Sequence, residues 1–195
     1  MKKFKLILKE SSITTEQSFK QRKEILNDPK FKKWFAGSKI VDDKGQPLVL
    51  YHGSKTSFST FKPSESGKYG PGIYMTYNPK YTENFSIKGT SSATGDSPQT
   101  FALYAKIVNP LVITDEIDDK AYAEMEKKIN MSREDERFPH DDVGALIGAM
   151  AKKGGFDGLI FNHPRMSEII AFNANQVKSA FASGYSLENP DITKE

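Results

Sequence analysis

The chain has 195 residues, of which 37% are hydrophobic and 11% aromatic, and this is enough apolar area for a globular core. Its net charge of +3 is too small to indicate a nucleic-acid partner. Cysteine is absent, which excludes disulfides, thiolate catalysis and cysteine-bound metal. No apolar run is long enough for a signal peptide or a membrane span. We therefore expect a soluble, cytoplasmic protein with no membrane partner.

The first segment with a regular pattern is 12–36, which we expect to be helical and to break at Pro29, because proline cannot continue a helix. Its lysines are expected to face solvent. Large apolar side chains can anchor the segment on a core: Ile25, Phe31, Trp34 and Phe35. We predict a helical appendage at 1–35, a main domain at 36–182 and a tail at 183–195.

Short apolar runs bounded by turn residues predict the strands that follow. A hairpin is expected first, from a strand at 39–42, a turn at 43–46 and a strand at 48–52. Further strands are expected at 72–78, 100–113, 157–162, 167–173 and 176–181. Helices are expected at 79–86, 115–131 and 141–155.

The spacing of the last three predicted strands decides the fold class. They follow one another too closely for crossover helices, so their neighbours are expected to be antiparallel. Clustered short strands with separate helices indicate an α+β fold and not a doubly wound sheet.

Common nucleotide and metal motifs are absent. The glycine-rich run 67–72 does not fit the dinucleotide fingerprint, because its spacing differs and it leads into a strand. The acidic run 115–119 lacks the glycine and ligand spacing of a calcium loop. The three histidines do not have the spacing of metal ligands: His52, His140 and His163. We predict no bound metal.

Three motifs remain, in a fixed order along the chain: LYHGS at 50–54, GIYMTYNPKYTENF at 72–85 and SEIIAFN at 167–173. Together they resemble the ADP-ribosyltransferases of the His-Tyr-Glu type, the class of diphtheria toxin and the poly(ADP-ribose) polymerases. The resemblance extends over about 36–182 and is closest to domains carried by phages, mobile elements and bacterial effectors. It implies an α+β fold, an ADP-ribosyltransferase-like split antiparallel β-sandwich with flanking helices.

The resemblance also implies a reaction, the cleavage of the bond between nicotinamide and ribose in the co-substrate NAD. Nicotinamide leaves as a neutral molecule, so the difficulty lies in the positive charge that develops on the ribose. By resemblance, Glu168 would stabilise that charge and hold the 2′-hydroxyl. His52 would bond the ribose of the adenosine half, and Tyr74 completes the implied catalytic set.

The remaining implied contacts concern binding of the nicotinamide group. Gly53 has no side chain, so its N–H and C=O can approach the carboxamide closely. Tyr74 and Phe85 would present aromatic faces to the ring. Thr82 could add a hydroxyl, and Ser54 belongs to the same cofactor-binding motif as His52.

Several questions stay open at this point. The acceptor can be a protein, an RNA or a DNA, and a role as a phage or bacterial toxin or effector would place the enzyme in the producing or the target cell. Met166 stands where arginine-modifying toxins have Glu or Gln, so modification of arginine is not expected. The alternatives are an NAD glycohydrolase and a catalytically degenerate binding module. In the second alternative Glu168 is structural and pairs with Arg165 or Lys178.

Overall fold

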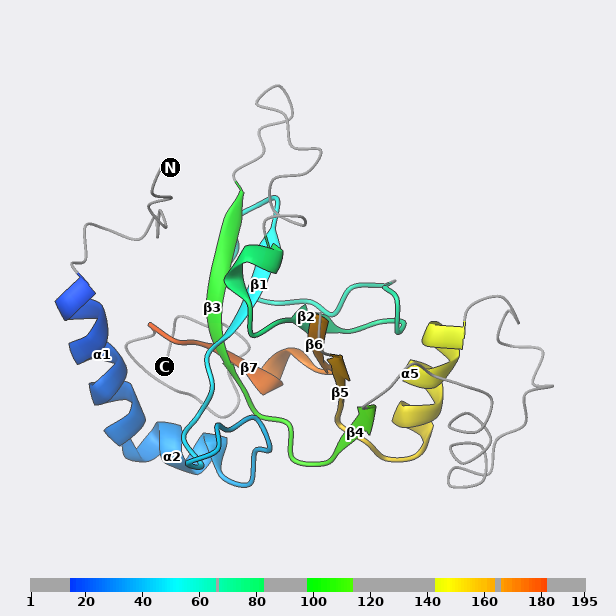
Figure 1. Cartoon of the computed structure of the whole chain (residues 1–195), viewed down its shortest axis with the longest axis horizontal. Helices are drawn as coiled ribbons and strands as arrows, with labels where there is room; N and C mark the ends of the chain where they lie inside the picture. The colour runs from blue at the N-terminus through cyan, green and yellow to red at the C-terminus, as the bar shows by residue number, and fades with distance from the viewer. Residues whose placement is uncertain (1–14, 66, 83–97, 114–142, 164–165, 182–195) are drawn as a thin grey trace.

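A computed structural model describes residues 15–65, 67–82, 98–113, 143–163 and 166–181 (Figure 1). These residues build two β-sheets with helices on their outer sides. The first sheet has the order β1-β3-β7, formed by β1 (Leu50–Ser54), β3 (Gln99–Ala105) and β7 (Val177–Ser179). The second has the order β2-β6-β5-β4, formed by β2 (Ile73–Met75), β6 (Met166–Ala171), β5 (Gly158–His163) and β4 (Pro110–Ile113).

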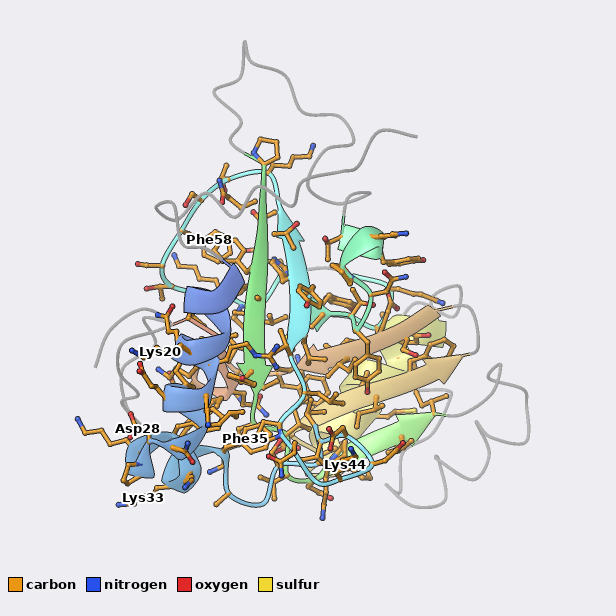
Figure 2. All side chains as sticks on the ribbon, turned by 60° about the vertical axis from the view of Figure 1, so that its left-hand side comes forward. Lys20, Asp28, Lys33, Phe35, Lys44 and Phe58 are labelled. Atoms are coloured by element: carbon orange, nitrogen blue, oxygen red, sulfur yellow. The ribbon has the colours of Figure 1, made fainter. Side chains whose placement is uncertain are left out.

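The two sheets pack against each other through apolar side chains, which alternate along each strand. In β3, Leu103 and Ala105 face the second sheet, whereas Ala102 and Tyr104 face the N-terminal helices. In β6, Ile169 joins the core between the sheets. Strands β1 and β3 stand upright in Figure 2, while the strands of the second sheet run across them. The sheets therefore share a core without being parallel layers.

The N-terminal helices are α1 (Thr15–Asn27) and α2 (Pro29–Phe35), and they break where the sequence predicted. Asp28 separates them and caps α2, because its side chain accepts a hydrogen bond from the Lys30 N–H at 2.7 Å. All four expected anchors are buried against the first sheet: Ile25, Phe31, Trp34 and Phe35. The described lysines of this segment are exposed, among them Lys20 and Lys33 (Figure 2). The division of the chain at residue 35 stays a prediction.

Helix α5 (Val143–Lys153) covers the outer face of the second sheet, on the opposite side of the molecule from α1 (Figure 1). Leu146, Ile147 and Met150 pack on β5 and β6. Two short 3₁₀ turns complete the described elements: η1 (Pro79–Thr82) and η3 (Ala174–Gln176). No helix among these residues is long and apolar enough to cross a lipid bilayer.

The α+β prediction is confirmed, but some pairings differ from those expected. Strand β4 pairs with β5 in parallel, so the second sheet is mixed. The cause is the long connection between them, which contains α5 and leaves room for a crossover. Strands β5 and β6 are antiparallel as predicted. Strand β7 leaves that sheet and pairs with β3.

Two predicted strands differ most from the observed structure, and the bounds of the others shift by one to three residues. The strand at 39–42 is reduced to a single bridge between Val41 and Pro47. The strand at 100–113 is two strands in different sheets, because the chain turns at Asn109 and Pro110 before β4. The predicted helix at 115–131 and the second half of the helix at 79–86 lie outside the described residues.

Candidate active site

A cavity of about 460 Å³ opens where the edge of the first sheet meets the second sheet. It is lined from four directions, by β1, by β2 with the loop before it, by η1 and by β6. The described residues that line it are Tyr51, His52, Gly53, Ser64, Gly67, Lys68, Tyr74, Met75, Thr76, Tyr81, Thr82 and Glu168. The lining therefore includes all three residues that the sequence predicted to be catalytic: His52 on β1, Tyr74 on β2 and Glu168 on β6.

The backbone of β1 explains why the cavity forms at this place. Tyr51 exchanges both backbone hydrogen bonds with Thr76, at 2.8 and 2.9 Å, and this bridge joins the two sheets. Backbone groups two residues apart in a strand point to the same side. The N–H and C=O of Gly53 therefore point away from β3, toward the side of β2, which beyond the Tyr51–Thr76 bridge pairs with β6 and not with β1. Gly53 offers one donor and one acceptor beside the cavity.

Gly53 is also required for the packing of η1. A Cβ atom at this position would collide with the backbone carbonyl oxygen of Thr82. The Thr82 hydroxyl donates to the Pro79 carbonyl at 2.6 Å and lies 3.1 Å from the Thr100 hydroxyl. Its proton is therefore used inside the protein, and the hydroxyl can serve a ligand only as an acceptor.

His52 is held in one orientation and one protonation state. Its Nδ1 lies 2.7 Å from the Tyr74 carbonyl oxygen, which can only accept, so Nδ1 carries the proton and donates. Burial lowers the pKa of His52 below its ordinary 6.5, and the hydrogen bond to Tyr74 opposes this in part. The imidazole is neutral at pH 7, with Nε2 as an acceptor. Aromatic rings pack around it: Phe58, Phe61 and Phe101.

Tyr74 organises the loop that precedes its own strand. Its hydroxyl accepts from the Tyr69 N–H at 2.9 Å and donates to the Gly70 carbonyl at 2.6 Å. Gly67 lies against the phenol ring so closely that a Cβ atom there would collide with it. The hydroxyl is thus engaged in structure, and the ring is the part of Tyr74 that remains for a ligand.

Glu168 lies on β6, directly across from Phe161 of β5. Its Oε2 atom is buried and makes no hydrogen bond within the described part of the chain. Burial raises the pKa of Glu168, and the positive charge of Lys68 opposes that rise. Lys178 gives Oε2 no hydrogen bond, and Arg165 lies outside the described residues. A buried carboxyl oxygen without a partner is costly unless a ligand binds it.

A second cavity of about 440 Å³ adjoins the first and shares His52, Ser64 and Tyr74 with it. Phe58 and Phe61 line its far side, and Phe58 is labelled in Figure 2. The two cavities therefore meet at these three residues.

The structure brings together five of the seven residues that the sequence singled out: His52, Gly53, Tyr74, Thr82 and Glu168. Ser54 does not line the cavity, and its hydroxyl accepts from the Thr56 N–H at 3.2 Å. Phe85 lies outside the described residues. The roles of all seven stay predictions.

Sequence analysis missed other residues that line the cavity, chiefly Lys68 and Tyr81. Tyr81 lies within the second motif, between Tyr74 and Phe85, and the aromatic content of that motif could have indicated it. Lys68 has no such signal, because a lysine among glycines and a tyrosine looks like any surface loop. Among the described residues no group of three His, Asp or Glu side chains is arranged to hold a metal.

Comparison with known families identifies the chain. Residues 42–185 match the family described as ADP-ribosyltransferase in polyvalent proteins. The chain belongs to this family. Membership accounts for the two-sheet α+β fold and supports an ADP-ribosylation activity that uses NAD as co-substrate.

Other comparisons add little to this assignment. A search of curated proteins found no relative. A crystal structure of an anti-CRISPR protein is similar at 14% sequence identity and a TM-score of 0.36, over 64% of this chain and 88% of that one. A likeness this low carries no argument about the fold or activity of this chain.

Proposed function

We propose that this chain cleaves the nicotinamide–ribose bond of NAD and transfers ADP-ribose to a macromolecular acceptor. The observation that carries the proposal is the cavity that Glu168 shares with the backbone of Gly53 and the ring of Tyr74. Within the described ranges, no hydrogen-bond partner occupies the Oε2 atom of Glu168. Family membership supplies the reaction class.

Gly53 and Tyr74 would bind the nicotinamide group. The carboxamide has one acceptor and one donor, and the N–H and C=O of Gly53 supply the matching pair. Tyr74 presents its ring. His52, neutral and with Nε2 as an acceptor, suits a ribose hydroxyl, which donates.

Glu168 would act on the ribose that loses nicotinamide. As the bond breaks, its electron pair leaves with nicotinamide and positive charge develops on the sugar. The carboxylate stabilises that charge, and its Oε2 accepts a hydrogen bond from the 2′-hydroxyl. A nucleophile of the acceptor then forms the new bond to the same carbon and releases its proton.

The first test compares Glu168→Gln with the parent and with Glu65→Gln, an exposed control on a nearby loop outside the cavity. Glu168→Gln is expected to turn over NAD about 100- to 1000-fold more slowly, because it loses one preorganised charge. Binding of NAD, measured by calorimetry, should change much less, because ground-state NAD has little positive charge on that ribose. A Glu168→Gln protein that turns over like the parent would make the carboxylate structural.

The second test identifies the acceptor. The parent is incubated with a cell lysate and NAD labelled in the adenylate part, and the products are treated separately with protease, RNase and DNase. Label released by one treatment names the class of acceptor. Label found only in free ADP-ribose would support a glycohydrolase, and NAD binding without turnover would support a degenerate binding module.

We further infer that the protein acts in the cytoplasm of the producing or the target cell, as a phage or bacterial effector. This inference rests on the resemblance of the three motifs to ADP-ribosyltransferase domains carried by phages, mobile elements and bacterial effectors. Expression of the parent should slow bacterial growth, and Glu168→Gln should not. Equal growth with both would contradict an effector role.

A further inference from the structure

Lys68 lies in a tight loop that is fixed from two sides. On one side, helix α5 presents Gly144 and Gly148, and a Cβ atom at either glycine would collide with the carbonyl oxygen of Lys68 or of Tyr69. On the other side, the Tyr74 hydroxyl bonds the backbone of the same loop. The backbone of Lys68 is therefore placed by packing, although its side chain reaches solvent.

The ammonium group of Lys68 is directed over aromatic rings. Its Nζ lies 5.1 Å from the ring centroid of Tyr69 and 5.1 Å from that of Phe161. A cation in this position is attracted by the ring faces. Phe161 is the cross-strand neighbour of Glu168, so the ammonium lies on the face of the sheet that carries this carboxyl group.

Lys68 and Glu168 nevertheless form no direct ion pair among the described residues, and Oε2 has no partner there. The rings hold the positive charge near the carboxyl group without occupying its oxygen. This arrangement favours the ionised carboxylate and leaves an acceptor open. A direct ion pair would also favour the ionised carboxylate, but it would occupy the oxygen that a ligand needs as an acceptor.

The other groups around Glu168 add no positive charge. The titratable groups that line the cavity with Glu168 are His52 and Tyr51 from β1, Tyr74 from β2, Tyr81 from η1 and Lys68 from the loop, with Tyr69 beside Lys68. Lys152 of α5 does not line the cavity; its Nζ donates to the Pro71 carbonyl at 2.8 Å and lies over the ring of Phe172. His52 is neutral, because burial lowers its pKa. Burial, with the nearby Glu168 charge, raises the pKa of Tyr69 to about 12, so this phenol is also neutral. Among these groups, Lys68 supplies the cation.

We propose that Lys68 is a positioning residue that acts through Glu168: it keeps the carboxylate charged while leaving Oε2 free to bind the ribose. The chemical benefit rests on the proposed function, whereas the coupling between the two side chains does not. Lys68 is not expected to contact the reacting atoms.

The coupling is tested by titration of the Glu168 carboxyl carbon in ¹³C NMR, with Glu168→Gln used to assign its signal. Three variants are compared with the parent. Lys68→Met removes the charge and keeps the stem, Lys68→Arg keeps the charge, and Lys44→Met is a control in an exposed turn (Figure 2). The midpoint of Glu168 is expected to move to higher pH in Lys68→Met alone. An unchanged midpoint in Lys68→Met would overturn the proposal.

The second readout is the pH profile of NAD turnover. In Lys68→Met the acid limb should move to higher pH, so that turnover at acidic pH falls about two- to fivefold, the size expected of a solvent-screened charge. Turnover at alkaline pH and KM for NAD should change little, and Lys68→Arg should restore the profile. A higher KM with an unchanged acid limb would mean that Lys68 binds NAD directly, against the proposal. If the parent does not cleave NAD, the proposed function fails and the titration still decides the coupling.

Discussion

Replacement of Tyr74 by Phe separates the two parts of this side chain, because it removes the hydroxyl and keeps the ring. Two hydrogen bonds are lost, one of 2.9 Å from the Tyr69 N–H and one of 2.6 Å to the Gly70 carbonyl. Each contributes about 1 kcal/mol net, so the free energy of unfolding should fall by about 2 kcal/mol. In a chain of 195 residues this corresponds to a decrease in Tm of roughly 4–8 °C.

The assay is thermal unfolding followed by circular dichroism, with and without NAD. Tyr77→Phe is the matched control, because Tyr77 lies in the same segment and is 37% exposed. Its Tm should stay close to that of the parent. NAD should still bind to Tyr74→Phe, because the ring face remains. A Tm of Tyr74→Phe equal to that of the parent would refute the view that this hydroxyl stabilises the loop from Gly67 to Gly70.

Two further predictions concern β1. The pKa of His52 is lower in the folded chain than its ordinary 6.5, so the unfolded chain binds the proton first and stability should decrease as the pH falls below about 6.5. In His52→Gln the Tm should fall less between about pH 7 and pH 5, and an identical pH dependence would contradict the assignment of a buried neutral imidazole. Gly53→Ala should displace η1 through the contact with Thr82. The free energy of unfolding, measured with denaturant, should fall by about 1–3 kcal/mol. The affinity for NAD, measured by calorimetry, should fall at least about tenfold. Unchanged affinity would mean that the Gly53 backbone does not bind the ligand.

Local features of the fold could be predicted from the sequence because their causes are local. Pro29 breaks the N-terminal helix by its own geometry, and Phe31 and Trp34 are too large and apolar to remain exposed. The parallel pairing of β4 with β5 could not be predicted in this way. It depends on where the chain returns after α5, and the pattern of residues within β4 does not record that path.

In the candidate site, too, residues within local motifs could be predicted, whereas residues placed by distant contacts could not. The motifs around His52, Gly53, Tyr74 and Glu168 indicated their shared cavity, because their order along the chain is typical of a known family. The position of Lys68 depends instead on two glycines of a helix more than seventy residues later in the chain. The contact of the Thr82 hydroxyl with Thr100 could not be predicted either, because it joins η1 to a different strand, β3.

The place of β6 in its sheet has a consequence for biosynthesis. This strand follows the other three strands of the second sheet along the chain, yet it lies between β2 and β5 in the middle of that sheet. A nascent chain that ends before β6 contains His52, Gly53 and Tyr74 but lacks Glu168. In such a chain β2 lacks β6, the strand with which it pairs in the second sheet. Domains emerge from the N-terminus during synthesis, so the cavity closes only when this late strand inserts. A site that depends on the Glu168 carboxyl group is thereby incomplete until β6 has been made.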